Sequence, residues 1–271
     1  MAEPLTRSDG GRRQAIAFRG GGFLPGLRRG PALAFFAVVL LLWQGAGTFG
    51  WISPLFLPSP VEIGRALYEV AASGELWRHV TASLGRLAGG WSIGTIAGLA
   101  LGCAMGIFTT ARSIGLPLVS ALFPIPKIAL LPLFILWLGI GEPSKWATIA
   151  LGVFFPTVIN SYSGIDGVPR NLIRMAQSFG LSPGAIVVKV ILPGALPSIL
   201  AGFRISASIA LILLVAAEMI GAEYGIGAFV LQAGHLMATD QLLAGVVVLS
   251  VLGLLIGAVL NRVERAVLRW R

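Results

Sequence analysis

Residues 167–193 read Gly-Val-Pro-Arg-Asn-Leu-Ile-Arg-Met-Ala-Gln-Ser-Phe-Gly-Leu-Ser-Pro-Gly-Ala-Ile-Val-Val-Lys-Val-Ile-Leu-Pro, a long polar interruption in a chain that is otherwise typical of a membrane protein. Pro169 suits the first position of a helix, because its missing N–H is not needed there. Leu172, Ala176 and Phe179 then recur at helical spacing. We therefore expect a short helix with these three residues on one side.

The same segment predicts a second helix after a turn. The other side of the first helix is polar and consists of Arg170, Asn171, Arg174, Gln177 and Ser178. Gly180 can end that helix in a left-handed conformation, and Ser182-Pro183 is typical of an N-cap and first helical position. A basic helix-glycine-helix unit between two apolar segments predicts a docking surface for a soluble partner.

Composition places the chain in a bilayer. Of 271 residues, 56% are hydrophobic and 11% are charged, whereas soluble domains carry about 25% charged residues. The net charge of +9 does not indicate nucleic-acid binding, because the basic residues lie between apolar segments rather than on one polar face. A single cysteine, Cys103, excludes a disulfide within the chain, and two histidines give no metal-ligand cluster.

Six apolar segments are long enough to cross about 30 Å of hydrocarbon as helices. We expect these spans at about 31–50, 84–107, 115–138, 146–165, 196–220 and 241–261. The first apolar run is too long for a typical signal peptide, so we expect it to remain as an uncleaved helix. The predicted fold is therefore all-α, with a transmembrane domain over 31–271.

Charge asymmetry predicts the orientation. With a cytoplasmic N-terminus, fifteen of the 20 Lys and Arg residues fall on the inner side and Lys127 falls within a span. Four fall outside: Arg65, Arg78, Arg86 and Lys145. Both termini and the 166–195 loop are then cytoplasmic. Residues 1–30 are rich in Gly and Arg and lack apolar periodicity, so we expect a disordered basic cytoplasmic tail.

The 166–195 loop resembles the cytoplasmic loop of ABC importer permeases, whose pattern is Glu-Ala-Ala, three residues, Gly, nine residues, Ile-x-Leu-Pro. The residues that match at this spacing are Ala176, Gly180, Leu192 and Pro193. Arg174 and Met175 stand where the family prefers Glu and Ala, and Val190 replaces Ile. The resemblance implies that this loop, including Pro169 and Arg174, transmits ATP-driven motion from a separate subunit.

Further blocks resemble the nitrate/sulfonate/taurine branch of these permeases, at 57–60, 74–77, 124–137 and 216–222. The resemblance implies a type I importer fold and a homodimer in the bacterial inner membrane, with the pathway at the dimer interface. It also implies two ATPase subunits that hold ATP and Mg, and an extracytoplasmic binding protein. The solute would be nitrate, an alkanesulfonate, taurine or a small vitamin precursor, selected largely by the binding protein.

The third span is interrupted by Pro117, Pro124, Pro126 and Pro132, with Lys127 among them. Broken helices at membrane depth persist where they are buried in protein or line a cavity. Lys127 and Pro126 are therefore candidates for the translocation pathway, where the lysine would attract an anion. The alternative is that Lys127 pairs with carbonyls released by the prolines or reaches the cytoplasmic surface.

Three further features have two interpretations each. Glu218 either faces the pathway near an external gate or is an interfacial carboxylate. Gly94, Gly98, Gly102 and Gly106 form one stripe that allows close helix packing, and we favour a neighbour in the same chain over a second copy. A capping box at Ser59-Pro60 and Glu62 predicts an external amphipathic helix, which is either a docking face or a connector.

Other functional classes fit less well. The chain has no Gly-x-x-x-x-Gly-Lys-Ser/Thr motif for ATP and no catalytic constellation or metal motif, so we expect neither an enzyme nor a bound cofactor. An ion-driven secondary transporter or channel would favour a relay of ionisable residues within the spans. Within the spans, Lys127 and Glu218 are the residues that could serve in one.

Overall fold

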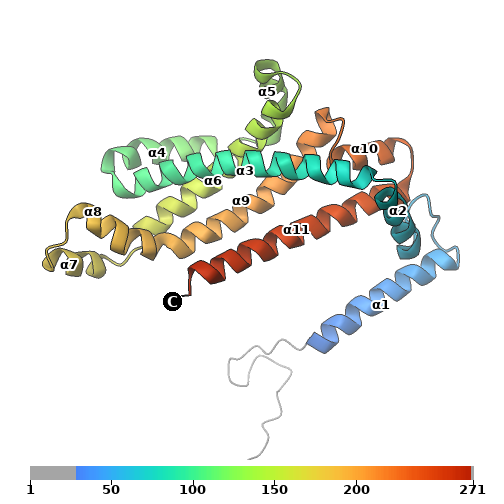
Figure 1. Ribbon diagram of the computed structural model, residues 1–271, viewed down its shortest axis with the longest axis horizontal. Helices are drawn as coiled ribbons and strands as arrows, with labels where there is room; N and C mark the ends of the chain where they lie inside the picture. The colour runs from blue at the N-terminus through green and yellow to red at the C-terminus, as the bar shows by residue number, and fades with distance from the viewer. Residues whose placement is uncertain (1–28, 270–271) are drawn as a thin grey trace, which may run out of the picture.

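The computed structural model describes residues 29–269, so the predicted basic tail lies almost entirely outside the described range. Within that range all regular structure is helical (Figure 1). The elements in order are α1 Arg29–Thr48, α2 Pro60–Ala72, α3 Glu75–Ile107, α4 Thr109–Leu122, η1 Lys127–Leu130, α5 Leu131–Leu138, α6 Glu142–Asp166, α7 Arg170–Ser178, α8 Pro183–Ile186, η2 Val187–Ile191, α9 Leu192–Gly221, α10 Ile226–His235 and α11 Thr239–Val267.

The described helices agree with six membrane spans. Five are long and apolar enough by themselves: α1, α3, α6, the run from α8 to α9, and α11. The sixth is a bent pair in which α4 and the η1–α5 segment meet at 88°. The predicted single span at 115–138 is therefore broken, because Pro124 and Pro126 cannot donate the backbone hydrogen bonds of a continuous helix.

The centre of the bundle is the contact between α3 and α6. A Cβ atom added at Gly98 would lie 2.7 Å from the Phe154 carbonyl oxygen, and one at Gly102 would lie 2.7 Å from that of Val158. Gly94 faces the Ala150 carbonyl of α6 in the same way, and Gly106 faces the Ile165 side chain. The neighbour of the glycine stripe is therefore in the same chain, and the absence of side chains lets the two backbones approach closely.

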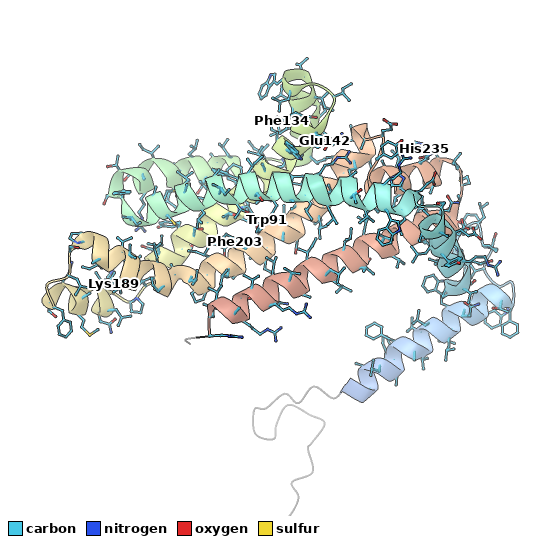
Figure 2. The ribbon with its side chains drawn as sticks, in the orientation of Figure 1. Trp91, Phe134, Glu142, Lys189, Phe203 and His235 are labelled. Carbon is cyan, nitrogen blue, oxygen red and sulfur yellow. The ribbon has the colours of Figure 1, made fainter. Side chains whose placement is uncertain are left out.

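Helix α9 packs on the other side of α6 and completes the core. The fully buried residues between these helices include Ile149 and Val153 of α6 with Ala210 and Leu214 of α9. Trp91 of α3 reaches α9, where its ring meets Phe203 edge to face and its Nε1 donates to Ser206 Oγ at 3.1 Å (Figure 2). The three helices thus form one packed unit.

Helix α2 begins with the expected capping box. The Ser59 backbone N–H donates to Glu62 Oε2 at 2.7 Å and the Ser59 hydroxyl donates to the same oxygen at 2.9 Å. These bonds hold the pKa of the Glu62 carboxyl below its usual value. The apolar side of α2, with Ile63 and Ala66, packs on Ala244 of α11.

Different helices lie at the two ends of the bundle. One end, which we call the loop end, carries α7 and α8 (Figure 1). The opposite end carries α2 and α10, and the turn from α9 to α10 lies toward it. Figure 2 shows Lys189 at the loop end and His235 at the opposite end.

Candidate functional site

The loop end is built around the turn at Gly180. Pro169 is the N-cap of α7 rather than its first helical residue, which corrects our expectation by one position. Gly180 has φ +74°, and its N–H donates to the Gln177 carbonyl at 2.9 Å. The next N–H, that of Leu181, reaches back to the Ala176 carbonyl at 3.2 Å. These two hydrogen bonds together form a Schellman motif, which ends a helix with a glycine in the left-handed region.

The second loop helix continues directly into the fifth span. Ser182 is its N-cap and accepts a hydrogen bond from the Ala185 N–H at 3.4 Å, with Pro183 as the first helical residue. A π-helical turn, η2, then joins α8 to α9, and the Leu192 N–H donates to the Val187 carbonyl. Pro193 cannot donate to a carbonyl four residues earlier, so it favours this wider turn. A movement of the loop would therefore act directly on α9.

The three residues expected on one side of α7 differ in burial. Ala176 is buried and Ile173 packs against the end of the core, so these two residues face inward. Leu172 and Phe179 are instead exposed, with Phe179 at 75%. Arg174 is also exposed. Because an exposed apolar stripe beside basic residues is unusual on a solvated helix, α7 presents the features of a docking surface.

The break between α4 and α5 surrounds Lys127. Its Nζ donates to the carbonyls of Leu122, at 3.3 Å, and Phe123, and it lies 4.6 Å from the centroid of the Phe155 ring. Pro126 has no N–H to donate to Leu122, and that carbonyl instead accepts from the Ile125 N–H at 3.3 Å and from the lysine. These contacts agree with the interpretation in which carbonyls at the break bind the lysine. The side chain is half-exposed, so it can also border a pathway.

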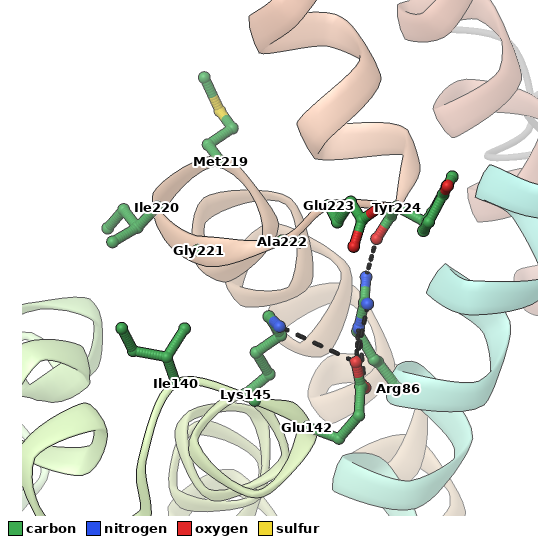
Figure 3. A pocket seen from close by; sticks show the side chains of 11 residues that line it. Arg86, Ile140, Glu142, Lys145, Met219, Ile220, Gly221, Ala222, Glu223 and Tyr224 are labelled. Carbon is green, nitrogen blue, oxygen red and sulfur yellow. Dashed lines mark hydrogen bonds and ion pairs between the residues drawn. The ribbon is translucent and has the colours of Figure 1, made fainter.

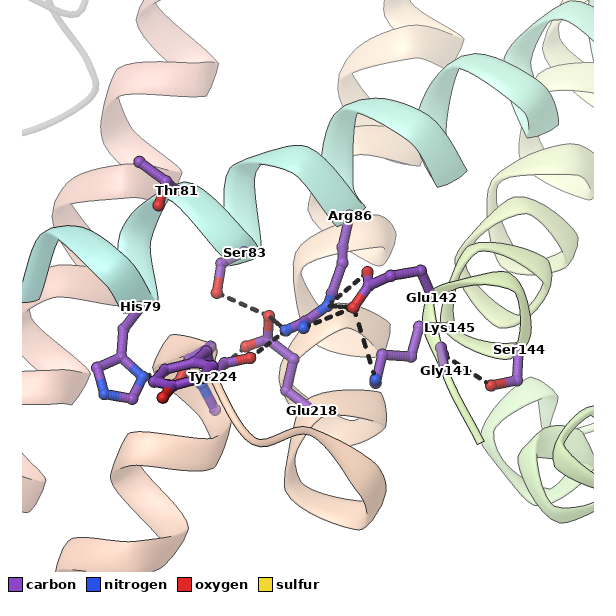
Figure 4. Close-up of polar contacts among 12 residues, drawn as sticks. His79, Thr81, Ser83, Arg86, Gly141, Glu142, Ser144, Lys145, Glu218 and Tyr224 are labelled. Atoms are coloured by element: carbon purple, nitrogen blue, oxygen red, sulfur yellow. Dashed lines mark hydrogen bonds and ion pairs between the residues drawn. The ribbon is translucent and has the colours of Figure 1, made fainter. Parts of the chain in front are cut away.

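A cluster of charged side chains joins α3, α6 and α9 beside the turn that leads into α10 (Figure 4). The Arg86 guanidinium of α3 donates to both carboxylate oxygens of Glu142 on α6, at 2.8 to 3.1 Å. Its Nη1 donates to Glu218 of α9 at 2.9 Å and to the carbonyl of Tyr224. Arg86 and Glu218 are buried, so their bond forms away from water, whereas the Glu142 side chain is 47% exposed.

Glu218 is the most enclosed member of this charge cluster, with 0% of its side chain exposed. It accepts hydrogen bonds from Ser83 Oγ at 2.7 Å and from the Gly227 N–H at 2.9 Å, besides the Arg86 bond. A buried carboxylate is tolerated when it is paired and fully hydrogen-bonded, as it is here. In this structure Glu218 therefore fastens α3, α9 and the start of α10 to one another.

The sequence reasoning missed most of this cluster. It assigned Arg86 to an external connection, whereas the side chain is buried inside the bundle. The signal was present, because Arg86 lies within the expected span at 84–107 and a cation there needs a partner. The identity of the partners was not accessible, since Glu142 and Glu218 are 56 and 132 residues away.

A cavity of about 510 Å³ lies beside the charge cluster (Figure 3). It opens between the turn that precedes α6 and the connection from α9 to α10. Its wall combines the ionic residues Arg86, Glu142, Lys145 and Glu223 with the apolar residues Ile140 and Ile220. A pocket of this size with a few charged groups is suited to a small polar solute.

Comparison with known families and proteins agrees with this geometry. Residues 94–270 match the model of the family described as binding-protein-dependent transport system inner membrane component. The taurine transport system permease protein TauC of Escherichia coli is 39% identical over 239 residues, which cover 86% of this chain and 87% of that protein. The Bacillus subtilis protein described as a putative aliphatic sulfonates transport permease, SsuC, is 38% identical over 87% of this chain and 85% of its own length.

A solved structure has the same arrangement of helices. An inward-facing crystal form of the MetNI methionine ABC transporter contains a chain that superposes with a TM-score of 0.61 at 25% identity. The match covers 71% of this chain and 95% of that chain.

Proposed function

The chain belongs to the family of binding-protein-dependent transport system inner membrane components, and we propose that the solute it carries is an organosulfonate such as taurine. It is the permease subunit of an ABC importer, a multi-pass membrane protein with a transport role. The names of the two relatives, which refer to taurine and aliphatic sulfonates, support a sulfonate over nitrate or a vitamin precursor.

The loop end is the proposed site of coupling to ATP hydrolysis. The observation that carries this proposal is the exposed surface of α7, with Leu172 and Phe179 uncovered and Arg174 beside them, on a loop that runs without interruption into α9. Two ATPase subunits, which hold ATP and Mg, would bind this surface. Their closure would push on 169–184 and move the start of α9, where Leu192 and Pro193 lie.

The remaining assembly follows from the same proposal. Two copies of the chain would form the pathway at their interface, and a binding protein would deliver the solute on the side opposite the loop. The broken span, with Pro126 and Lys127, would border the pathway, since half-exposed polar groups at membrane depth line water or partner surfaces. Glu218 would hold the helices at the delivery side rather than contact the solute.

Reconstitution tests the proposed function against the ion-driven alternative. We expect proteoliposomes that contain the permease, its ATPase and its binding protein to accumulate labelled taurine when ATP is supplied on the ATPase side. A sodium or proton gradient without ATP should give no accumulation. Gradient-driven accumulation without ATPase subunits would instead support a secondary transporter.

We propose that the loop and both termini face the cytoplasm of a bacterial cell, with residues 139–142 and α2 outside. Cysteine labelling of whole cells tests this orientation. The exposed Tyr68 of α2 serves as the outer probe. Tyr68→Cys should react with an impermeant reagent, and Arg262→Cys should react after permeabilisation. The reverse pattern would contradict the orientation.

A further inference from the structure

Lys145 is a buried cation whose hydrogen bonds are not satisfied within the described part of the chain. The residue is 5% exposed, and it lines the 510 Å³ cavity between α6 and the α9–α10 connection (Figure 3). Its Nζ forms an ion pair with Glu142 Oε1, but at 3.8 Å the two atoms are beyond hydrogen-bond distance. That oxygen already accepts from Arg86 Nε at 3.1 Å and from Nη2 at 2.8 Å.

An ammonium group carries three N–H donors and no acceptor. The ion pair with Glu142 offsets part of the hydration that a largely buried ammonium loses, and the remaining N–H donors face the cavity. The Arg86 guanidinium does not create this difficulty, since its donors reach Glu142, Glu218 and Tyr224. Lys145 therefore points to a negatively charged group that enters the cavity.

The other charge that distinguishes the cavity is a carboxylate. Glu223 lines the same space and is exposed, and no ion pair or hydrogen bond holds its carboxylate among residues 29–269. The cavity thus offers one cation and one anion beyond the Arg86 cluster. A ligand with a single negative charge would satisfy Lys145 but leave Glu223 unmatched, whereas a zwitterion would pair with both.

We propose that this cavity is a solute-binding site on the permease itself, formed for a zwitterionic aminosulfonate, with the sulfonate on Lys145 and the ammonium on Glu223. Ile140, Met219 and Ile220 supply the apolar part of the wall, against which the methylene groups of the solute would pack. The choice of a sulfonate rests on the proposed function. The site lies away from the coupling loop, so it would receive the solute on the delivery side.

Direct binding tests the site without the binding protein. The permease–ATPase complex in nanodiscs is titrated with taurine and with ethanesulfonate, which lacks the amino group. We expect taurine to bind more tightly. Lys145→Gln should weaken the binding of both solutes by about tenfold or more, because each loses a charge-assisted hydrogen bond. Lys145→Arg should be less affected, since it keeps the charge.

Glu223→Gln is the specificity variant. We expect it to weaken taurine binding and leave ethanesulfonate binding the same or tighter, so that the preference for taurine disappears. Arg262→Gln is the matched control for Lys145→Gln, because it removes one positive charge but lies on α11 away from the cavity. Its affinity for both solutes should equal that of the unmodified complex.

If Lys145→Gln fails to assemble, chemical modification of a cysteine at this position tests the same charge. In a Cys103→Ser background, Lys145→Cys leaves one thiol in the chain. Reaction with 2-aminoethyl methanethiosulfonate restores an ammonium group and should restore taurine binding, whereas a neutral methyl reagent should not. Taurine should also slow the labelling of this thiol. Equal binding after both reagents would overturn the proposed role of the Lys145 charge.

Three outcomes separate this inference from the proposed function. Taurine binding that is unchanged in Lys145→Gln would overturn the site, while ATP-driven taurine uptake would leave the proposed function intact. Absence of taurine uptake by the complete wild-type system would overturn the proposed function. If Lys145→Gln raises the binding-protein concentration needed for half-maximal uptake but leaves direct taurine binding unchanged, the cation faces a carboxylate of the binding protein, and the solute site is excluded.

Discussion

The charge cluster and the coupling loop differ in how their ion pairs are exposed to solvent. In the cluster, the buried Arg86 connects α3 with the fully buried Glu218 of α9 and with Glu142 of α6, whose side chain is 47% exposed. Near the loop, the ion pair of Arg112 with Asp166 measures 2.9 Å but is exposed on both sides. Because exposed pairs contribute little and buried ones are costly to break, the two regions should respond very differently to mutation.

This difference implies a division of roles. The side of the bundle with the charge cluster is fastened and would keep its helices together during transport. The loop has few groups that bind it to the bundle, and its conformation depends on local signals such as the Gly180 turn. Mutations in the cluster should therefore change the stability of the protein, and mutations in the loop should change transport.

The largest expected effect is that of Arg86→Ala. It leaves Glu218 buried without its cation, which should cost about 3–5 kcal/mol and sharply reduce the amount of assembled permease. Arg78→Ala, which removes an exposed arginine from the same helix, should have little effect on stability. Thermal unfolding in detergent measures both. Similar midpoints for the two variants would break the proposed contrast.

The glycine stripe gives the next largest effect. Gly98→Ala places a methyl group 2.7 Å from the Phe154 carbonyl oxygen, so α3 and α6 must separate at a cost of about 1–3 kcal/mol. Gly85→Ala lies on the same helix with nothing within 4 Å of the added Cβ, and it should stabilise by up to about 1 kcal/mol. Opposite shifts of the unfolding midpoint are therefore expected, and equal shifts would contradict close packing at Gly98.

Lys127→Met separates the two interpretations of the broken span. If Lys127 borders the pathway, the variant should assemble as well as the wild type, because removal of a charge relieves an insertion cost. Uptake should fall, Lys127→Arg should be partly impaired, and the affinity of the isolated binding protein should not change. Loss of stability by about 1 kcal/mol with unchanged uptake per complex would show that the lysine has a structural role, as the donor to the carbonyls of Leu122 and Phe123.

Phe179→Ala should have the smallest effect on stability. The side chain is 75% exposed, so the free energy of unfolding should change by less than about 0.5 kcal/mol. If α7 docks on the ATPase, the same change should weaken ATPase binding by about fivefold or more. Phe56→Ala, which removes an equally exposed ring outside the loop, is the matched control. Unchanged ATPase affinity in Phe179→Ala would argue against docking through this face.

The sequence predicted local features better than distant contacts. The left-handed Gly180, the cap at Ser182 and the capping box at Ser59 depend on residues within a few positions, and all three were expected. The sequence did not indicate which apolar stripe of α7 faces inward, because Leu172 and Phe179 fit the helical period as well as Ile173 and Ala176 do. Only tertiary packing decides which of two apolar stripes faces the core.

The charge cluster was beyond sequence reasoning for a different reason. Arg86, Glu142 and Glu218 belong to three helices, and nothing in the local pattern of any one of them indicates the other two. The 88° bend was also unforeseen, although its prolines were recognised as an interruption. Proline predicts that a helix is broken, but the direction in which the chain continues depends on the surrounding helices.

The coupling role of the loop is the central claim, and Gly180→Pro tests it most directly. Proline cannot adopt φ +74° and cannot donate the bond to the Gln177 carbonyl, so the turn must change. Gly50→Pro is the matched control, because Gly50 has φ +70° in a connection outside the loop. ATP hydrolysis and taurine uptake are measured together in proteoliposomes with equal amounts of assembled complex. We predict that Gly180→Pro hydrolyses ATP but loses uptake, while Gly50→Pro retains both. Normal uptake by Gly180→Pro would contradict the account.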